Sequence, residues 1–234
     1  MKKVEFYEHM YKINEDVTAK STRYDRLRQL ILDFRPKKFL DIGCGDGSFL
    51  RSICSDDMIC FGLDIKATGE DPMILRCDID NEPIPLMVGE DFDVVFAGEI
   101  IEHLYDPEHM LDEIRRVLKP GGYLILTTPN LAAWYNRISL LLGYQPLFSG
   151  VGLRGTYGTL WPAVHAESHL RLYTLPALRG LIESCGFKVV RTIGFGINNR
   201  VGWGKKHPIL AWIANKMFRS VGLSSLLVVI AEKR

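Results

Sequence analysis

The sequence lacks several features that would place it in other classes of protein. It has no uncharged apolar run close to the roughly 20 residues that a membrane-spanning helix needs. Two lysines near the start are followed by no apolar segment, so we expect no signal peptide. The five cysteines form no CxxC pair and no metal-ligand spacing. These absences predict a cytoplasmic protein with reduced thiols, which could also lie peripherally at a membrane surface.

Acidic residues are scarce in one part of the chain. Residues 1–130 contain 16 Lys+Arg and 25 Asp+Glu, whereas residues 131–234 contain 13 Lys+Arg and only 3 Asp+Glu. All four tryptophans lie in the second part. An acidic part suits a cationic ligand, and a basic, tryptophan-rich part suits an anionic partner or surface. The alternative is a charge distribution that serves solubility alone.

Short apolar runs alternate with segments of helical spacing. We expect helices at 22–34, 107–118, 174–187 and 208–219, and strands at 38–42, 58–65, 73–79, 91–99, 123–129, 187–195 and 225–233. Pro107 and Thr174 would start two of these helices, and Pro120–Gly122 and Gly186 would end them.

This alternation predicts the α/β class: a Rossmann-like, seven-stranded, mostly parallel sheet with helices on both faces and an antiparallel C-terminal strand pair. We expect one domain over residues 1–234 with a core at 38–130. A substrate or lid segment would be inserted at 131–172, and an apolar helical insertion would occupy 196–224.

A glycine-rich loop, DIGCGDG at 41–47, follows the first expected strand. A dinucleotide fingerprint needs a third glycine, but Ser48 stands at that position. Asp46 at the helix start would repel a pyrophosphate and would favour a cationic sulfonium. Asp64, 21 residues after Gly43, is placed at the next strand end to accept ribose hydroxyls. The loop therefore favours S-adenosylmethionine, with S-adenosylhomocysteine as its product, over a nicotinamide dinucleotide.

Five motifs recur in the order and spacing of a known family: FLDIGCGDGSFL, GLDIK, CDID, FDVVFAGEIIEHL and LKPGGYLILTTPN. They resemble class I S-adenosylmethionine-dependent methyltransferases, in the branch of ubiquinone-biosynthesis O-methyltransferases and polysaccharide- and lipid-pathway enzymes. The resemblance covers residues 38–130 and, less closely, 169–195. It is specific for fold and cofactor and weak for the substrate.

The resemblance implies a role for each motif in holding the cofactor. Asp41 and the loop would line its methionine part, the acids after the next two strands would hold ribose and adenine, and the end of the fourth strand would lie near the transferable methyl. The residues so implied are Asp41, Gly43, Cys44, Gly45, Asp64, Ile65, Asp78, Ile79, Ala97, Gly98 and Glu99.

Three histidines are candidates for the base that removes a proton from an acceptor hydroxyl: His103, His165 and His169. The alternative for the last two is a structural turn. Glu99, Glu102 and His103, at i, i+3 and i+4, would share a face of a helical turn and could bind a divalent metal, which we nevertheless consider unlikely here.

Further residues are candidates for binding the acceptor: Asn130, Arg171 and Tyr173, with Arg171 suited to a phosphate or carboxylate. Methylases of base amino groups typically carry [DN]PP[YFW] after the fourth strand, where this sequence reads AGEI. No Pro-Cys pair for cytosine methylation is present either. Nucleic acid is therefore a less favoured substrate, despite the basic part of the chain.

Two aromatic, apolar segments at 131–148 and 207–222 complete the expectations. They could form a lid over the substrate, a peripheral membrane contact or a homodimer interface. The leading interpretation is in-line methyl transfer, with oxygen favoured, to a small or lipid-linked acceptor that is anionic or amphipathic. The alternatives are a tRNA or rRNA methyltransferase and a catalytically silent cofactor-binding partner protein.

Overall fold

The computed structural model describes residues 22–152, 157–161, 169–196 and 220–234, together with residues 206, 207, 209, 212, 214 and 216. Of the predicted helix at 208–219 only residues 209, 212, 214 and 216 are described, and much of the predicted insertion at 196–224 falls outside the described residues. Those residues of the segment that are described, from Lys206 to Lys216, are helical where assigned.

A seven-stranded sheet forms the centre of the described structure, in the order β3-β2-β1-β4-β5-β7-β6. The first five strands are parallel, and β7 runs antiparallel to both of its neighbours. This arrangement confirms the fold class predicted from the sequence. The strands are β1 (Lys38–Ile42), β2 (Ile59–Asp64), β3 (Ile74–Arg76), β4 (Phe92–Gly98), β5 (Leu118–Pro129), β6 (Phe187–Phe195) and β7 (Leu226–Lys233).

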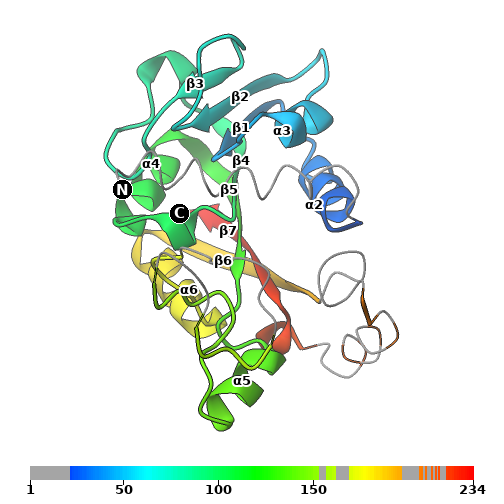
Figure 1. The fold of residues 1–234 in the computed structure, drawn as a ribbon. Coiled ribbons are helices and arrows are strands. Elements are labelled where there is room, and N and C mark those ends of the chain that lie inside the picture. The colour runs from blue at the N-terminus through cyan, green and yellow to red at the C-terminus, as the bar shows by residue number, and fades with distance from the viewer. Residues whose placement is uncertain are drawn as a thin grey trace.

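Helices cover both faces of the sheet, as Figure 1 shows, with α2 and α3 on one side and α4 and α6 on the other. Successive strand residues point to opposite faces, so Val94 packs with the first helix pair and Val95 with the second. The helices are α2 (Thr22–Leu32), α3 (Ser48–Ile53), α4 (Pro107–Val117), α5 (Trp134–Leu141) and α6 (Leu175–Ser184), with short 3-10 turns η2 (Leu86–Val88), η3 (Ile101–His103) and η4 (Val221–Leu223).

The helix starts predicted from the sequence are present. Asp106 caps α4 by accepting a hydrogen bond from the His109 amide, with Pro107 in the first turn. Thr174 caps α6 through its side chain. Cys185 is the residue that ends α6, and Gly186 follows it with φ +85°. The predicted end of that helix is therefore wrong by one residue.

The predicted boundary between α4 and the fifth strand is also wrong. The helix ends at Val117, and β5 already begins at Leu118 rather than at Tyr123. Leu118 pairs with Phe92, and the next pair is Tyr123 with Val94. The register shifts between these two pairs, where β5 contains the Pro-Gly-Gly sequence. Gly121 adopts φ +71° there. A Pro-Gly-Gly run indicates a break in a pattern, but it does not show that strand pairing exists on both sides of the break.

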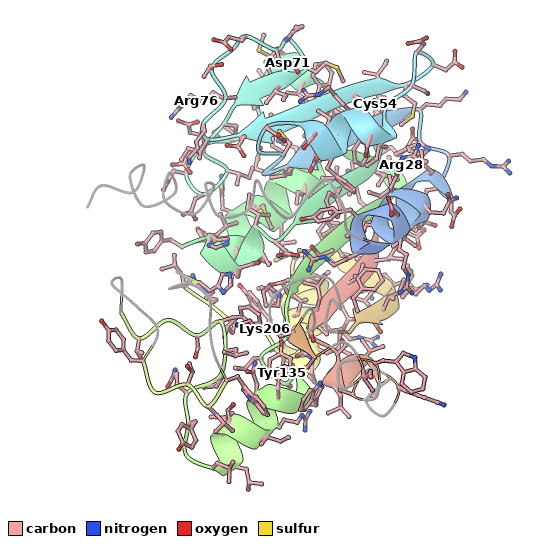
Figure 2. The ribbon with its side chains drawn as sticks, turned by 45° about the vertical axis from the view of Figure 1, so that its right-hand side comes forward. Arg28, Cys54, Asp71, Arg76, Tyr135 and Lys206 are labelled. Atoms are coloured by element: carbon pink, nitrogen blue, oxygen red, sulfur yellow. A yellow bond between two sulfur atoms is a disulfide. The ribbon has the colours of Figure 1, made fainter. Side chains whose placement is uncertain are left out.

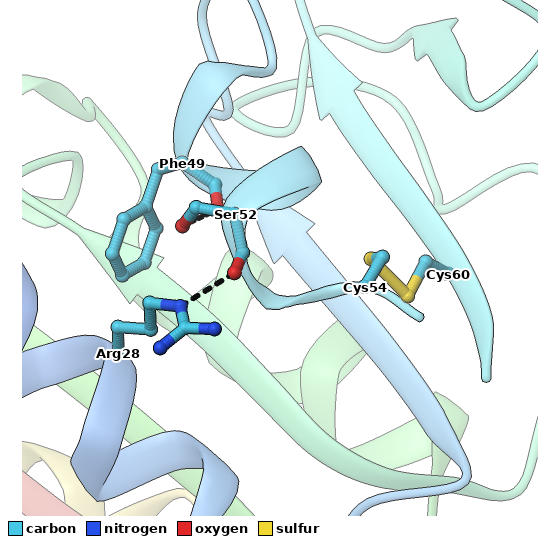
Figure 3. The surroundings of a disulfide bond; sticks show 5 residues. All are labelled: Arg28, Phe49, Ser52, Cys54 and Cys60. Atoms are coloured by element: carbon cyan, nitrogen blue, oxygen red, sulfur yellow. Dashed lines mark hydrogen bonds between the residues drawn. A yellow bond between two sulfur atoms is a disulfide. The ribbon is translucent and has the colours of Figure 1, made fainter. Parts of the chain in front are cut away.

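Cys54 and Cys60 form a disulfide, which corrects the expectation that all thiols are reduced. Cys54 ends α3 and Cys60 lies in β2, with their Cα atoms 6.2 Å apart. Figure 3 shows this bond and a nearby hydrogen bond between α2 and α3, in which Arg28 Nε donates to the Ser52 carbonyl at 2.6 Å. The two cysteines meet because the chain turns back from α3 into β2. Their spacing in the sequence does not reveal this turn.

The insertion at 131–172 is described only in part. It contains α5 and a bridge between Gln145 and Thr159, and it is joined to the sheet through Asn130. Across the described residues, every helix is too short or too polar to cross a membrane.

Reduction of the disulfide should lower the free energy of unfolding by about 2 kcal/mol, because the bond restricts the unfolded chain over a short loop. Urea denaturation of the oxidised and reduced protein measures this difference, with the C54S/C60S double variant as the reduced reference. Alkylation in denaturant should detect three thiols before reduction and five after it. Five thiols without reductant, or equal urea midpoints, would contradict the assignment.

Candidate functional site

A cavity of about 220 Å³ lies at the carboxyl ends of β1, β2 and β4. Most of the predicted cofactor residues line it, from Asp41 in β1 to Glu99 after β4. Ala97 does not line it, because it is fully buried in the core, and its neighbour Phe96 is exposed to the cavity instead. The lining residues that the sequence did not single out are Tyr24, Ile42, Phe49, Leu63, Cys77, Phe96, Ile100 and Leu104.

The glycine loop turns sharply beneath this cavity. Gly43 and Gly45 adopt φ +74° and +59°, which a residue with a Cβ rarely does. A Cβ on Gly43 would also come within 2.7 Å of the Ile100 side chain. The amides of Gly43 and Cys44 donate to the Leu63 carbonyl at 2.7 and 3.1 Å, so the loop folds onto the end of β2.

Asp64 holds the loop in place from the end of β2. Its Oδ2 accepts the Gly45 amide at 2.9 Å, and its Oδ1 accepts the Lys66 amide at the same distance. The residue is 3% exposed. Each carboxylate oxygen can accept more than one hydrogen bond, so a carboxylate can accept from a backbone amide and from a ligand hydroxyl at once. The sequence predicted a ribose ligand here but not this structural role in the loop.

Asp41 is the most deeply buried acid of the cavity, at 1% exposed. No described residue donates a hydrogen bond to its Oδ2. Burial, and then the nearby Asp64 carboxylate, raise the pKa of Asp41 well above its usual value. This carboxyl therefore retains a proton to unusually high pH unless a cation binds beside it.

Asp46 occupies the start of α3, as the sequence suggested. Its Oδ1 accepts the amide and the hydroxyl of Ser48, at 2.9 and 2.5 Å. Burial would raise the pKa of Asp46, but these hydrogen bonds outweigh it and lower the pKa below its usual value. A charged carboxylate thus already occupies the place where a dinucleotide enzyme would bind phosphate.

The start of α2 covers one side of the cavity, which the sequence did not indicate. Tyr24 lines the cavity and contacts Phe49 edge to face at 5.6 Å. Arg23 forms a 3.0 Å ion pair with Glu99. Because these residues lie about 20 positions before the glycine loop with no local motif, only their position in space could have shown the contact.

Glu99 is thereby excluded from the metal face predicted with Glu102 and His103. It precedes η3 with a left-handed backbone, φ +52°, and turns toward Arg23. Spacing of i, i+3 and i+4 predicts a shared face only inside an α-helix. Here the segment is a single 3-10 turn, so the spacing was misleading.

His169 takes the place of Glu99 in this cluster. Ligand atoms of Glu102, His103 and His169 all lie within 4.8 Å of one another. Glu102 is fully buried and accepts the Thr128 hydroxyl at 2.9 Å. One carboxylate and two imidazoles could hold a divalent ion. The expectation that this protein uses no metal stays a prediction.

The imidazoles of His103 and His169 lie beside each other, and His103 is the one that lines the cavity. Their ring centroids are 4.8 Å apart. Burial lowers the pKa of His169, partly offset by the Phe148 carbonyl and by Glu99. His169 is therefore neutral near pH 7 and able to accept a proton. The third candidate base, His165, lies outside the described residues.

The three predicted acceptor-binding residues make structural contacts and do not line the cavity. Asn130 is fully buried, and its side-chain amide donates to the Ser224 carbonyl at 2.8 Å. Arg171 donates to the carbonyls of Leu104 and Tyr105. Tyr173 pairs with Asn130 in a bridge, and burial raises its pKa to about 12. The sequence indicated polar residues next to the predicted insertion, but it did not show which way their side chains point.

Comparison with known proteins places this geometry in a family. A model of the methyltransferase domain matches residues 15–192. The ubiquinone biosynthesis O-methyltransferase of Cereibacter sphaeroides is 30% identical over 132 residues, which are 50% of each chain. The mitochondrial enzyme of that name from Homo sapiens is 27% identical over 181 residues, 71% of this chain and 45% of the relative. The matches thus span about half of the length of these relatives.

The fold comparison agrees. The 1,6-didemethyltoxoflavin-N1-methyltransferase of Burkholderia thailandensis, solved with bound S-adenosylhomocysteine, superposes with a TM-score of 0.59 at 15% identity, covering 99% of this chain and 86% of that one. The family match confirms the methyltransferase class that the sequence predicted, and the structural similarity confirms the predicted fold. The chain belongs to the methyltransferase domain family.

Proposed function

We propose that this protein transfers a methyl group from S-adenosylmethionine to an oxygen of a small or amphipathic acceptor. The observation that carries the proposal is the charge of the cavity. Its described lining includes five acidic residues and neither lysine nor arginine: Asp41, Asp46, Asp64, Asp78 and Glu99. Such a wall favours a ligand that carries an ammonium and a sulfonium, and it disfavours a phosphorylated dinucleotide.

In this proposal each part of the cavity holds one part of the cofactor. Asp64 accepts the ribose hydroxyls, and Asp78 with Ile79 contacts adenine. Asp41 pairs with the ammonium of the methionine part above Gly43 and Gly45. Gly98 and Glu99, at the end of β4, then lie near the methyl group. These contacts orient the sulfonium for in-line attack, and orientation alone can account for several kcal/mol of the rate.

His169 is the base that removes the proton of the acceptor hydroxyl in this proposal. It is held neutral by burial and lies beside His103, which reaches the cavity itself. An acceptor that enters past the two imidazoles would meet the base and the methyl group together. The relatives named as O-methyltransferases favour oxygen as the acceptor atom. The basic second part of the chain favours an anionic or amphipathic acceptor.

Cofactor binding should release a proton from Asp41. The raised pKa of Asp41 means that the free protein keeps this proton above the usual value of 3.8, whereas a bound cation stabilises the carboxylate. The affinity for S-adenosylmethionine should therefore rise with pH up to the pKa of the free protein and stay constant above it. Titration calorimetry in two buffers of different ionisation enthalpy measures the protons released.

Asp41→Asn is the control for this experiment, since it keeps the shape of the side chain without its charge. Its affinity should be at least tenfold weaker, and Asp41 should no longer contribute to proton release. A wild-type affinity that does not change with pH would exclude the titration of Asp41. Well-folded protein that binds neither S-adenosylmethionine nor S-adenosylhomocysteine would overturn the proposed function.

Loss of the base should slow transfer without weakening cofactor binding. His169→Gln is expected to lower kcat by about 10² to 10⁴, the usual contribution of a general base. In wild type, kcat/KM should fall on acidification only below pH 6.5, because the pKa of His169 is lowered from that value. Formation of S-adenosylhomocysteine with a panel of catechols and amphipathic phenols provides the rate.

His109→Gln is the matched control, because His109 contacts the Glu82 carbonyl away from the cavity. It should keep the wild-type rate. A His169→Gln enzyme with an unchanged rate and pH profile would assign the proton transfer to another group.

A second proposal concerns how an amphipathic acceptor is reached: α5 and the loops beside it contact an anionic membrane surface. Their large apolar side chains are exposed, Leu141 most of all at 84%. Residues 131–166 contain two arginines and no acidic residue. Figure 2 shows Tyr135 of α5 at the opposite end of the molecule from Cys54 and Arg28. The exposed residues are Ile138, Leu140, Leu141, Leu142, Tyr144, Val151 and Tyr157.

Co-sedimentation with vesicles tests this surface through two similar leucines. Leu141→Glu should abolish pelleting with phosphatidylserine vesicles, since it places a carboxylate in the apolar surface. Leu86→Glu changes an equally exposed leucine, 85% against 84%, in η2 and should leave pelleting unchanged. No lipid-dependent pelleting of the wild type would remove the membrane proposal. A dimer that Leu141→Glu dissociates would show that the surface joins two copies instead.

A further inference from the structure

The backbone carbonyl of Phe148 contacts the ring of His169, and the rings of the two residues also lie near each other, with their centroids 6.1 Å apart. The Nδ1 of His169 lies 3.0 Å from the carbonyl oxygen of Phe148, 21 residues earlier in the chain. A carbonyl oxygen only accepts hydrogen bonds, so this contact requires the proton on Nδ1. In the neutral imidazole the lone pair then lies on Nε2. The contact thus selects one of the two tautomers of the ring.

The backbone of Phe148 is in an unfavourable conformation at this contact. Its φ is +71°, in the left-handed region that side chains with a Cβ rarely adopt. A phenylalanine here costs more than a glycine would, and such strain persists only where surrounding contacts impose it. The conformation brings the Phe148 carbonyl to His169.

The surrounding contacts come from α5. Asn136, fully buried on that helix, accepts the Leu147 amide at 2.8 Å and lies 3.5 Å from the Leu147 carbonyl through its amide nitrogen. On the other side of Phe148, the Ser149 hydroxyl donates to the Pro146 carbonyl and accepts from Gln145. The turn is therefore closed on both sides of Phe148.

The other side of His169 is held from the core. The amides of Leu170 and Arg171 donate to the Glu102 carbonyl at 2.8 and 3.1 Å. The main chain that follows His169 is thus attached beside η3, while its ring is attached to the insertion. Rotation of the imidazole would break the contact with Phe148.

We propose that Phe148 is a positioning residue, whose left-handed backbone carbonyl holds His169 as the Nδ1–H tautomer and leaves Nε2 as the proton-accepting atom. The inference rests on the proposed role of His169 as the base. It assigns to the insertion a function in catalysis that is separate from covering the substrate: it determines which nitrogen of the base can act. The backbone of Phe148, and not its aromatic ring, carries this role.

Two substitutions separate the backbone from the ring. Phe148→Gly removes the ring and accepts the left-handed conformation without strain. Phe148→Val keeps an apolar side chain but is β-branched and strongly disfavours positive φ. Nitrogen-15 NMR of histidine-labelled full-length protein at about pH 8 reports the tautomer of His169 directly, and the His169→Gln spectrum assigns its signal.

Wild type and Phe148→Gly should show His169 as the Nδ1–H tautomer, although the Nε2–H form is the more common in free histidine. In Phe148→Val the ratio of Nδ1–H to Nε2–H should fall roughly tenfold, as expected from the cost of the left-handed conformation. Its kcat should fall while its affinity for S-adenosylhomocysteine stays unchanged, which also verifies that the variant is folded.

The Nε2–H form in wild type would overturn the proposal, and this outcome does not depend on any variant. Equal loss of the Nδ1–H form in the Gly and Val variants would assign the effect to the ring, and its retention in both would remove Phe148 from the role. A tautomer change in Phe148→Val without a change in kcat would leave the positioning intact and refute His169 as the base, so the two failures are distinguishable.

Discussion

The carboxylate of Asp64 is the contact on which the rest of the site depends. One oxygen holds the Gly45 amide and the other holds the Lys66 amide, so the end of β2 determines the path of the glycine loop at the end of β1. The loop can follow this path because its glycines accept positive φ. With the loop in place, α3 begins beside it, and the ring of Phe49 on that helix contacts the rings of Phe96 and Tyr24. The shape of the cavity therefore depends on Asp64 and on the glycines of the loop.

The same acid also determines the electrostatics of the cavity. Burial, and then the nearby Asp64 carboxylate, raise the pKa of Asp41, and the described lining contains no lysine or arginine beside either group. An empty cavity of this kind is unfavourable for a second negative charge and favourable for a positive one. Arg23 compensates Glu99 at the rim through their ion pair. The interior of the cavity therefore favours a cationic ligand, in agreement with S-adenosylmethionine, the cofactor predicted from the sequence.

The segment predicted as an insertion, 131–172, contains His169, the proposed base, and lies far from the glycine loop in the sequence. Its loop contacts His169 through Phe148, and the segment after His169 attaches to Glu102 behind the cavity. The surface that α5 and the loops beside it present outward is apolar and aromatic, and residues 131–166 contain no acidic residue. One segment therefore links the proposed base to the surface proposed to meet the acceptor.

The sequence by itself determined the sheet, the loop and the cofactor class, because each depends on local chemistry: apolar period, glycine conformation, and an acid at a strand end. It also placed Asp41, Asp64 and Asp78 at one edge of the sheet, since carboxyl ends of parallel strands meet there. Tertiary structure alone decided the contacts between distant segments. These are the Cys54–Cys60 bond, the Arg23–Glu99 ion pair, and the hydrogen bonds that Asn130 and Arg171 donate to backbone carbonyls. A spacing rule predicts neighbours only within one regular element, and these partners meet because the sheet and the insertion bring separate elements together.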